Sequence, residues 1–245
     1  MVVKINTLLA SFPKKRPNLP DEYKEIFHKH YLDNRSSRGF VGKVAHKLES
    51  WMHNRACRDL KNICKPYSTL EVGAGTLNHL AYEEQGQVYD VVEPYRELYL
   101  DSPEKDRVRH FFDDISDVRG AYDRIISIAV FEHLIDLPGV ISRCGVLLKA
   151  GGTLRVGIPA QGSPLWKMAY TFSTGAVFYM RYRLSYERLM QHEHVNNWQE
   201  IRLLLNYFFE DVKSSQMGLT PSLSLYHFYE CSTPVLERCI KYSRG

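Results

Sequence analysis

The stretch LEVGAGTLNHL, residues 70–80, joins a short apolar run to two glycines and then to a helical pattern. An apolar strand that ends in Gly73 and Gly75 permits a tight turn and a close approach of the backbone to a ligand. The same glycine pair also occurs in plain strand-to-helix turns, so on its own it leaves both readings open. The segments that follow must therefore decide what the turn is for.

Short runs rich in Val and Ile follow one another along the chain, with helical patterns between them. The runs occupy residues 68–73, 88–94, 108–112, 123–130 and 151–160, and the helical patterns residues 76–85, 95–102 and 137–149. This alternation predicts βαβ units and a parallel sheet covered on both faces. A helix over 197–208 and two strands over 210–217 and 223–232 complete the pattern. Their connection contains Gly218 and Pro221, which predicts an antiparallel pair.

Two other parts of the chain depart from this rhythm. Residues 1–65 are predicted to form a Pro- and Lys-rich arm and two cap helices, one from Pro20 and one from Val41 to Cys64, with Trp51 and Met52 in the core. Residues 66–245 form the main domain. Within it, residues 161–195 are a long insertion rich in aromatic and arginine side chains. We interpret the insertion as a lid or substrate wall, with a satellite core of packed aromatics as one alternative and a membrane surface that touches lipid-linked sugars as another.

The composition is that of a soluble globular protein, with 44% hydrophobic and 24% charged residues and a net charge of +4. Basic and aromatic residues do not interleave in the way that marks RNA-binding sheets, which argues against nucleic-acid binding. Five scattered cysteines without a C-x-x-C pair argue against a disulfide framework and favour a reducing compartment, the cytoplasm. We expect no signal peptide, because the apolar part of residues 1–17 is too short and its charges lie on the wrong side. We expect no stable membrane insertion, because the most apolar later stretch, 164–180, is interrupted by Lys167.

Acidic residues stand at the ends of the predicted strands, where an adenosine would lie. Glu93 comes twenty residues after Gly73, at a position that accepts hydrogen bonds from ribose hydroxyls. Asp114 follows the third run and suits an adenine amino group, although a loop or cap role is the alternative. The positions expected to border the ligand are Glu71, Gly73, Ala74, Gly75, Glu93, Pro94, Asp114, Ile115, Ile128, Ala129 and His133.

Two features of the opening stretch distinguish a dinucleotide from S-adenosylmethionine as the ligand. A dinucleotide turn has a third glycine where this chain has Asn78, and the chain lacks a basic residue placed for a phosphate. Glu71, two residues before Gly73, suits a cationic ligand. The residues therefore favour S-adenosylmethionine, and an NAD-dependent oxidoreductase is the weaker alternative.

The motifs LEVGAGTLNHL, VVEP, DDISDV, YDRIISIAVFEHLID and LLKAGGTLRVGIP resemble those of class I S-adenosylmethionine-dependent methyltransferases over residues 66–160. The resemblance implies an α/β, Rossmann-like, seven-stranded, mostly parallel sheet with an antiparallel last strand beside its neighbour. It also implies that Glu71, Gly73 and Gly75 border the methionine part, that Glu93 holds the ribose, and that Asp114 with Ile115 meets the adenine.

The flanking segments PDEYKEIFHKHYLDNR, KLESWMH and HEHVNNWQEI are similar to those of methyltransferases from bacterial surface-polysaccharide and modified-sugar biosynthesis. This likeness implies a sugar or sugar-nucleotide acceptor that is methylated on oxygen or nitrogen. A quinone, lipid or natural-product acceptor is the alternative, and so is a non-catalytic adenosine-binding partner protein. A homodimer is left open. The polar-tipped residues expected at the cofactor mouth are Tyr23, Tyr31, Asn34 and Arg35.

Three histidines are the candidates for catalysis. His133 follows the fourth strand, where an imidazole suits removal of a proton from the acceptor; packing on the cofactor or capping the next helix is the alternative. His192 and His194 occupy alternate positions of a segment expected to be extended, so both are predicted to face the cleft with Glu193 pointing away. Their spacing is not that of H-E-x-x-H, and we expect neither a third ligand nor a metal.

Overall fold

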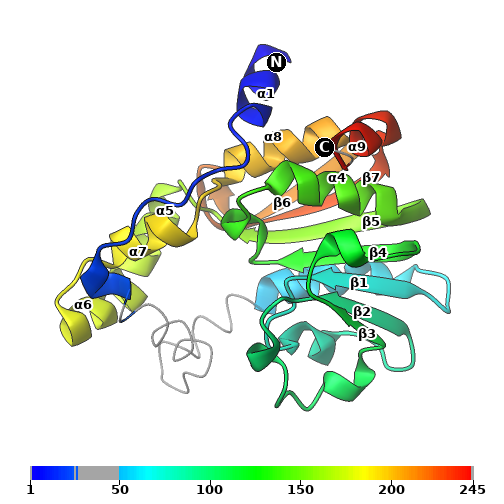
Figure 1. The fold of residues 1–245 in the computed structure, drawn as a ribbon, viewed down its shortest axis with the longest axis horizontal. Coiled ribbons are helices and arrows are strands. Elements are labelled where there is room, and N and C mark those ends of the chain that lie inside the picture. Colours follow the sequence, from blue (N-terminus) through cyan, green and yellow to red (C-terminus); the bar gives the residue numbers. More distant parts are fainter. Residues whose placement is uncertain (1, 25, 27–49, 244–245) are drawn as a thin grey trace.

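The computed structural model of the 245-residue chain describes residues 2–24, 26 and 50–243. Its centre is a seven-stranded sheet with the order β3-β2-β1-β4-β5-β7-β6 (Figure 1). Neighbouring strands from β3 to β5 pair in parallel, and β7 lies antiparallel between β5 and β6. The predicted fold class is confirmed, including the inserted antiparallel last strand. The strands are β1 (Ser68–Val72), β2 (Val88–Val92), β3 (His110–Phe112), β4 (Tyr122–Ile128), β5 (Leu148–Pro159), β6 (Phe209–Thr220) and β7 (Leu223–Pro234).

Each predicted apolar run coincides with a strand, and the predicted antiparallel pair is the β6–β7 hairpin. The helices are less regular than predicted. The expected helix over 76–85 is a short 3-10 turn, η2 (Asn78–Tyr82), and that over 95–102 is η3 (Arg96–Leu98). Leu77 is left-handed (φ 64°) and so breaks an α-helix at its start. The second segment is framed by Pro94 and Pro103, which leaves too little length for a stable helix.

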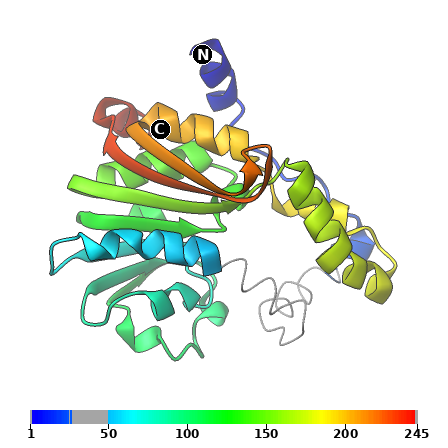
Figure 2. The same ribbon diagram turned by 180° about the vertical axis from the view of Figure 1, so that it is seen from behind.

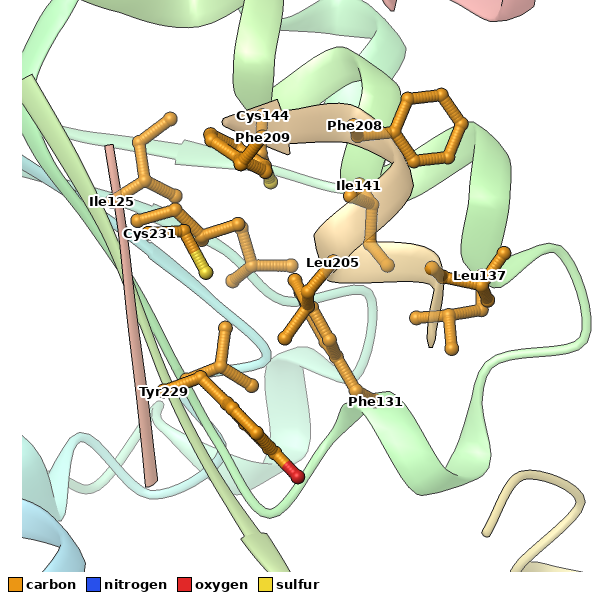
Figure 3. Packing of buried hydrophobic residues seen from close by; sticks show 14 of the residues in the cluster. Ile125, Phe131, Leu137, Ile141, Cys144, Leu205, Phe208, Phe209, Tyr229 and Cys231 are labelled. Carbon is orange, nitrogen blue, oxygen red and sulfur yellow. The ribbon is translucent and has the colours of Figure 1, made fainter. Parts of the chain in front are cut away.

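The principal core lies between the sheet and the helices α4 (Leu137–Leu147) and α8 (Trp198–Phe208). Figure 3 shows Ile141 of α4 and Leu205 of α8 among the buried side chains of this layer. The predicted helix over 197–208 is confirmed. Its start is fixed by a capping box in which the Asn197 side chain and the Glu200 side chain each accept a backbone N–H of the other residue. The helices α1 (Val2–Leu9) and α9 (Leu236–Ser243) also contribute side chains here, and α1 was not predicted.

The second face of the sheet carries the described part of the predicted cap. Residues 50–56 are helical and continue into the 3-10 helix η1 (Cys57–Lys61); the part of the predicted helix before residue 50 lies outside the described residues. The guanidinium of Arg124 on β4 is buried and donates to Asp59, Glu83 and the Ala56 carbonyl. Met52 is buried, as predicted, against Gly157 of β5. Trp51 packs beside it at the edge of a small cluster.

The insertion forms a helical lobe beyond the carboxyl end of β5 (Figures 1 and 2). It consists of α5 (Pro164–Tyr170), the π-helical η7 (Thr171–Gly175), α6 (Ala176–Tyr182) and α7 (Tyr186–Glu193). Leu19 and Tyr23 of the arm pack with Phe178 and Leu189 in a separate small core, so the satellite-core alternative is confirmed for these side chains. The described part of the chain includes no helix long and apolar enough to cross a membrane.

The N-terminal arm runs without regular structure from Ser11 to Pro20, as predicted, and lies along the lobe (Figure 1). The buried Tyr23 hydroxyl donates to the Ser185 carbonyl and accepts from the Ser185 N–H, and its expected place at the cofactor mouth stays a prediction. The expectations for Tyr31, Asn34 and Arg35 lie outside the described residues. All five cysteines are free thiols, which agrees with the predicted lack of a disulfide framework.

Candidate functional site

The strand order reverses between β1 and β4, so the loops after these two strands face each other across the site where α/β sheets bind ligands. Gly73 (φ +76°) and Gly75 (φ +52°) give the first loop its left-handed turn. A Cβ built on Gly73 would lie 2.4 Å from Cγ2 of Val130, which belongs to the second loop. Gly73 therefore makes room for a side chain of the neighbouring loop, which the sequence did not indicate.

Glu93 at the end of β2 is buried, and both of its carboxylate oxygens touch the backbone. Oε2 accepts the N–H of Gly75 at 2.8 Å, and Oε1 accepts the N–H of Tyr95 at 3.1 Å. A carboxylate has about four acceptor positions, so each oxygen retains one more. The geometry fits the predicted role of Glu93, because two hydroxyls of one ribose require two acceptor positions.

Glu71 was expected to border the ligand, but its side chain is buried more deeply than that position suggests. Its carboxylate is buried and accepts the hydroxyl of Tyr89 at 2.8 Å. Burial raises the pKa of Glu71, while His79 and the Tyr89 hydrogen bond partly oppose the increase. Its role toward a cationic ligand stays a prediction. Tyr89, the residue that orients it, has no motif around it that would have revealed this role.

Asp114 is exposed and caps the 3-10 helix η5 (Ile115–Asp117), accepting the N–H of Ser116 at 2.7 Å. The cap uses Oδ1, so this role and the predicted adenine contact are compatible. Ile115 beside it is buried. At the end of β4, Ala129 has a left-handed φ of 55°, a strained conformation of the kind that gathers at functional sites.

His133 and His194 meet at the carboxyl edge of the sheet, one from η6 (Phe131–His133) and one from the loop after α7. Their ring centroids are 4.7 Å apart in an edge-to-face arrangement. Nδ1 of His133 lies 3.0 Å from the backbone carbonyl of Glu193, which can only accept, so Nδ1 carries the proton. Nε2 of His133 is 3.7 Å from Oε1 of the buried Glu132.

His194 is held by a different acceptor. Its Nδ1 lies 3.2 Å from Oε1 of Gln161, which also accepts the indole N–H of Trp166. Burial, with contributions from His133 and Arg16, lowers the pKa of His194 well below its usual value, so the ring is neutral at pH 7.

The predicted orientation of the H-E-H segment is wrong, because α7 extends to Glu193 and the segment is not extended. His192 turns toward the arm, with Nδ1 2.7 Å from the Pro17 carbonyl. The Glu193 carboxylate does not point away and lies 3.6 Å from Nδ1 of His133. The expectation that no third metal-ligand residue stands near the histidines is also wrong, since ligand atoms of Glu132, His133 and His194 all lie within 4.8 Å of one another.

A second group with ligand-type side chains, Cys57, His79 and Glu83, lies on the other face of the sheet. Glu83 is hydrogen-bonded to His79 and Arg124, which lower its pKa to about 2 against the opposing effect of burial. This carboxylate is thus already neutralised by a guanidinium, and the group has the character of a buried structural network.

The arm and Asn196 hold together the loops around the histidines. The sequence did not indicate this role for either of them. Arg16 donates to the backbone carbonyls of His133, His192 and Glu193. The buried side chain of Asn196 donates to the carbonyls of Phe131 and Leu134. Such carbonyl contacts depend on tertiary structure and leave no periodic pattern in a sequence.

A cavity of about 410 Å³ lies between the arm, the loop after β5 and the end of α7, with His194 in its wall. Lys15 and two glutamine amides give it a polar lining, and the second lysine, Lys14, is paired with Glu200 at 2.8 Å. The lining residues are Ser11, Lys14, Lys15, Pro17, Gln161, Gln191, His194 and Val195.

Among solved structures, the plantazolicin methyltransferase BpumL bound to a substrate analogue and S-adenosylhomocysteine is similar with a TM-score of 0.61 and 15% identity, over 95% of this chain and 98% of that one. The chain has the fold of class I methyltransferases. Magnesium protoporphyrin IX methyltransferase from Synechocystis PCC 6803 gives a TM-score of 0.58 and 14% identity, over 85% of this chain and 97% of that one. The CurJ carbon methyltransferase gives 0.54 and 16%, over 82% of this chain but only 57% of that one. No protein-family model and no curated protein matches the chain.

Proposed function

We propose that the protein is an S-adenosylmethionine-dependent methyltransferase. The observation that carries the proposal is the contact of Glu93 with the N–H of Gly75, which joins the acidic end of β2 to the glycine turn after β1. This pairing leaves two carboxylate acceptor positions beside a turn that approaches a ligand through its backbone. Solved structures of the same fold hold S-adenosylhomocysteine, which supports the choice of cofactor.

The acceptor is, in this proposal, a small polar molecule that binds in the cavity beside His194, most simply a sugar or sugar nucleotide. The glutamine amides and Lys15 of the lining suit hydroxyl and phosphate groups. The arm and the lobe, residues 11–20 and 161–195, would then enclose the acceptor and exclude water. A cytoplasmic reaction in surface-polysaccharide synthesis is compatible with this acceptor.

S-adenosylmethionine, when bound, supplies an electrophilic methyl group. The chain must hold the acceptor in line with that methyl and take the proton that the acceptor oxygen loses. We assign proton removal to Nε2 of His133, because Nδ1 donates to the Glu193 carbonyl and Nε2 is therefore the nitrogen that accepts a proton in the neutral ring. His194 would position the ring of His133 from the side, and His192 would hold the arm through Pro17.

Titration calorimetry with S-adenosylhomocysteine tests the cofactor assignment. Glu93→Ala removes two charge-assisted hydrogen bonds, and we expect it to weaken binding by about 30-fold or more. Glu97→Ala, an exposed carboxylate four residues away, is the matched control and should bind as the unaltered protein does. Absence of heat with the unaltered protein at millimolar ligand would refute the proposal. Binding without methyl transfer to any member of a sugar-nucleotide panel would favour a non-catalytic adenosine-binding protein.

A further inference from the structure

The outer face of the lobe carries large apolar side chains that point into solvent. Phe172 is 78% exposed, and four neighbours in the same continuous helical segment from α5 to α6 are each about half exposed. We refer to this set as the apolar ridge, and it consists of Met168, Phe172, Val177, Tyr179 and Met180.

The winding of the helix aligns the ridge. In an uninterrupted α-helix, residue 180 would lie about 120° around the axis from residue 168. The π-helical η7 lies between them and has more residues per turn, so it rotates Met180 back toward the face of Met168 and Phe172. Tyr170 and Phe178, on the opposite side of the segment, are buried against the body of the lobe. The segment therefore buries one apolar face and exposes another.

Within residues 164–186 the charged side chains are all basic, and one of them is neutralised by a carboxylate of α7. Residues 164–186 contain Lys167, Arg181 and Arg183 and no acidic residue. The first carboxylate after them, Glu187, is paired with Lys167 at 2.6 Å. Apolar and aromatic side chains flanked by basic ones are the pattern of a helix that lies in the headgroup region of an anionic bilayer. Two copies of the ridge packed against each other would bring these arginines together, which opposes self-association.

We propose that the apolar ridge docks the protein on the surface of an anionic phospholipid membrane. Because α5 begins three residues after Gln161, which lines the cavity, docking would place the acceptor site close to the bilayer. The proposal thereby deepens the proposed function, on which this last step rests: the acceptor would be a polar headgroup or sugar presented at a lipid surface. The chain would rest on the membrane without spanning it.

Co-sedimentation with vesicles tests the docking and requires neither cofactor nor activity, so its failure is distinct from failure of the proposed function. The full chain should bind vesicles of phosphatidylglycerol mixed with phosphatidylcholine, and bind pure phosphatidylcholine at least about tenfold more weakly. The triple variant Met168→Gln, Phe172→Gln and Met180→Gln should lose at least about tenfold of the binding to anionic vesicles.

The matched control is Leu100→Gln with Leu236→Gln, two leucines that are each 52% exposed and lie outside the lobe. This control should bind vesicles as the unaltered chain does. Far-UV circular dichroism and thermal melts establish that both variants fold; should the triple variant unfold, Phe172→Gln alone replaces it, with a smaller expected loss. Three results would each overturn the proposal: no binding to anionic vesicles, equal binding to neutral ones, or a triple variant that binds as the control does. A concentration-dependent dimer that the triple variant abolishes, in the absence of vesicle binding, would identify a second copy as the occupant.

Discussion

Replacing Gly73 by alanine tests the contact between the two loops of the candidate site. The new Cβ would meet Val130 at 2.4 Å and would stand on a backbone with φ +76°. Gly86 has the same φ of +76°, but a Cβ there has nothing within 4 Å. The pair Gly73→Ala and Gly86→Ala therefore separates steric contact from backbone strain.

The structure sets the magnitudes. Left-handed backbone costs a residue with a Cβ about 1–2 kcal/mol, and alanine recovers about 0.4–1 kcal/mol through the unfolded state. Gly86→Ala should thus lower the free energy of unfolding by about 1 kcal/mol. Gly73→Ala adds the cost of overpacking, about 1–3 kcal/mol, for a total loss of about 2–4 kcal/mol. Combining it with Val130→Ala removes the overpacking, so the double variant should be more stable than the sum of the two single losses predicts.

Urea unfolding followed by circular dichroism measures these losses, and calorimetry with S-adenosylhomocysteine measures the effect on the site. Gly73→Ala should weaken that binding, and Gly86→Ala, at the turn before β2, should not. Equal losses of stability for Gly73→Ala and Gly86→Ala would refute the reasoning, because the contact with Val130 would then carry no energy. The same conclusion would follow if Val130→Ala gave no recovery.

Three further perturbations probe other parts of the molecule. His133→Ala should lower kcat by about 10²–10⁴-fold with unchanged affinity for S-adenosylhomocysteine, and full turnover would remove His133 from catalysis. Arg16→Lys keeps the positive charge, but a lysine side chain cannot donate to the three carbonyls that Arg16 contacts. We therefore expect the KM for the acceptor to rise several-fold and the affinity for the cofactor to stay the same. A change in cofactor affinity alone would contradict this expectation. Burial lowers the pKa of His227 to about 4, so the unfolded chain binds the extra proton first as pH falls. Stability should therefore decline by about 2 kcal/mol between pH 7.5 and 5 in urea titrations, and a slope unaltered in His227→Gln would disprove the assignment.

The strands were predictable because β-branched runs between turn residues carry a local signal, and all of them form where that signal lies. The prediction of an α-helix over 76–85 was wrong, and it shows that local sequence signals do not determine every element. His79 and Glu83 in that segment belong to a buried network with Arg124, and the left-handed Leu77 prevents an α-helix from starting before them. Neither the partner nor the strand it lies on is visible from the segment itself.

In the candidate site, too, features next to strand ends could be anticipated from the sequence and features that depend on tertiary contacts could not. Glu93 directly follows a strand end, so its place beside the Gly75 turn could be anticipated from the sequence, while its role toward a ribose stays a prediction. The orientation of His192 and Glu193 was mispredicted, because it depends on α7 continuing through both residues and on the arm crossing them. The arm is held in place by hydrogen bonds from Arg16 to backbone carbonyls. Such contacts produce no periodic pattern in the sequence, so the position of the arm could not be predicted.

The proposed cofactor and acceptor halves of the site are therefore built from different kinds of structure. This difference affects which residues can determine the specificity for the acceptor. The cofactor half consists of turns that directly follow adjacent strands, so the sheet fixes it and changes there disturb the fold, as the contact of Gly73 with Val130 illustrates. The proposed acceptor half is assembled from the arm, η6, the loop after β5 and the end of α7, which contact one another mainly through side chains and carbonyls. Exposed side chains such as Lys15 line it without supporting the core. A change of acceptor thus requires substitutions only in the arm and the lobe, while the sheet and its cofactor turns stay as they are.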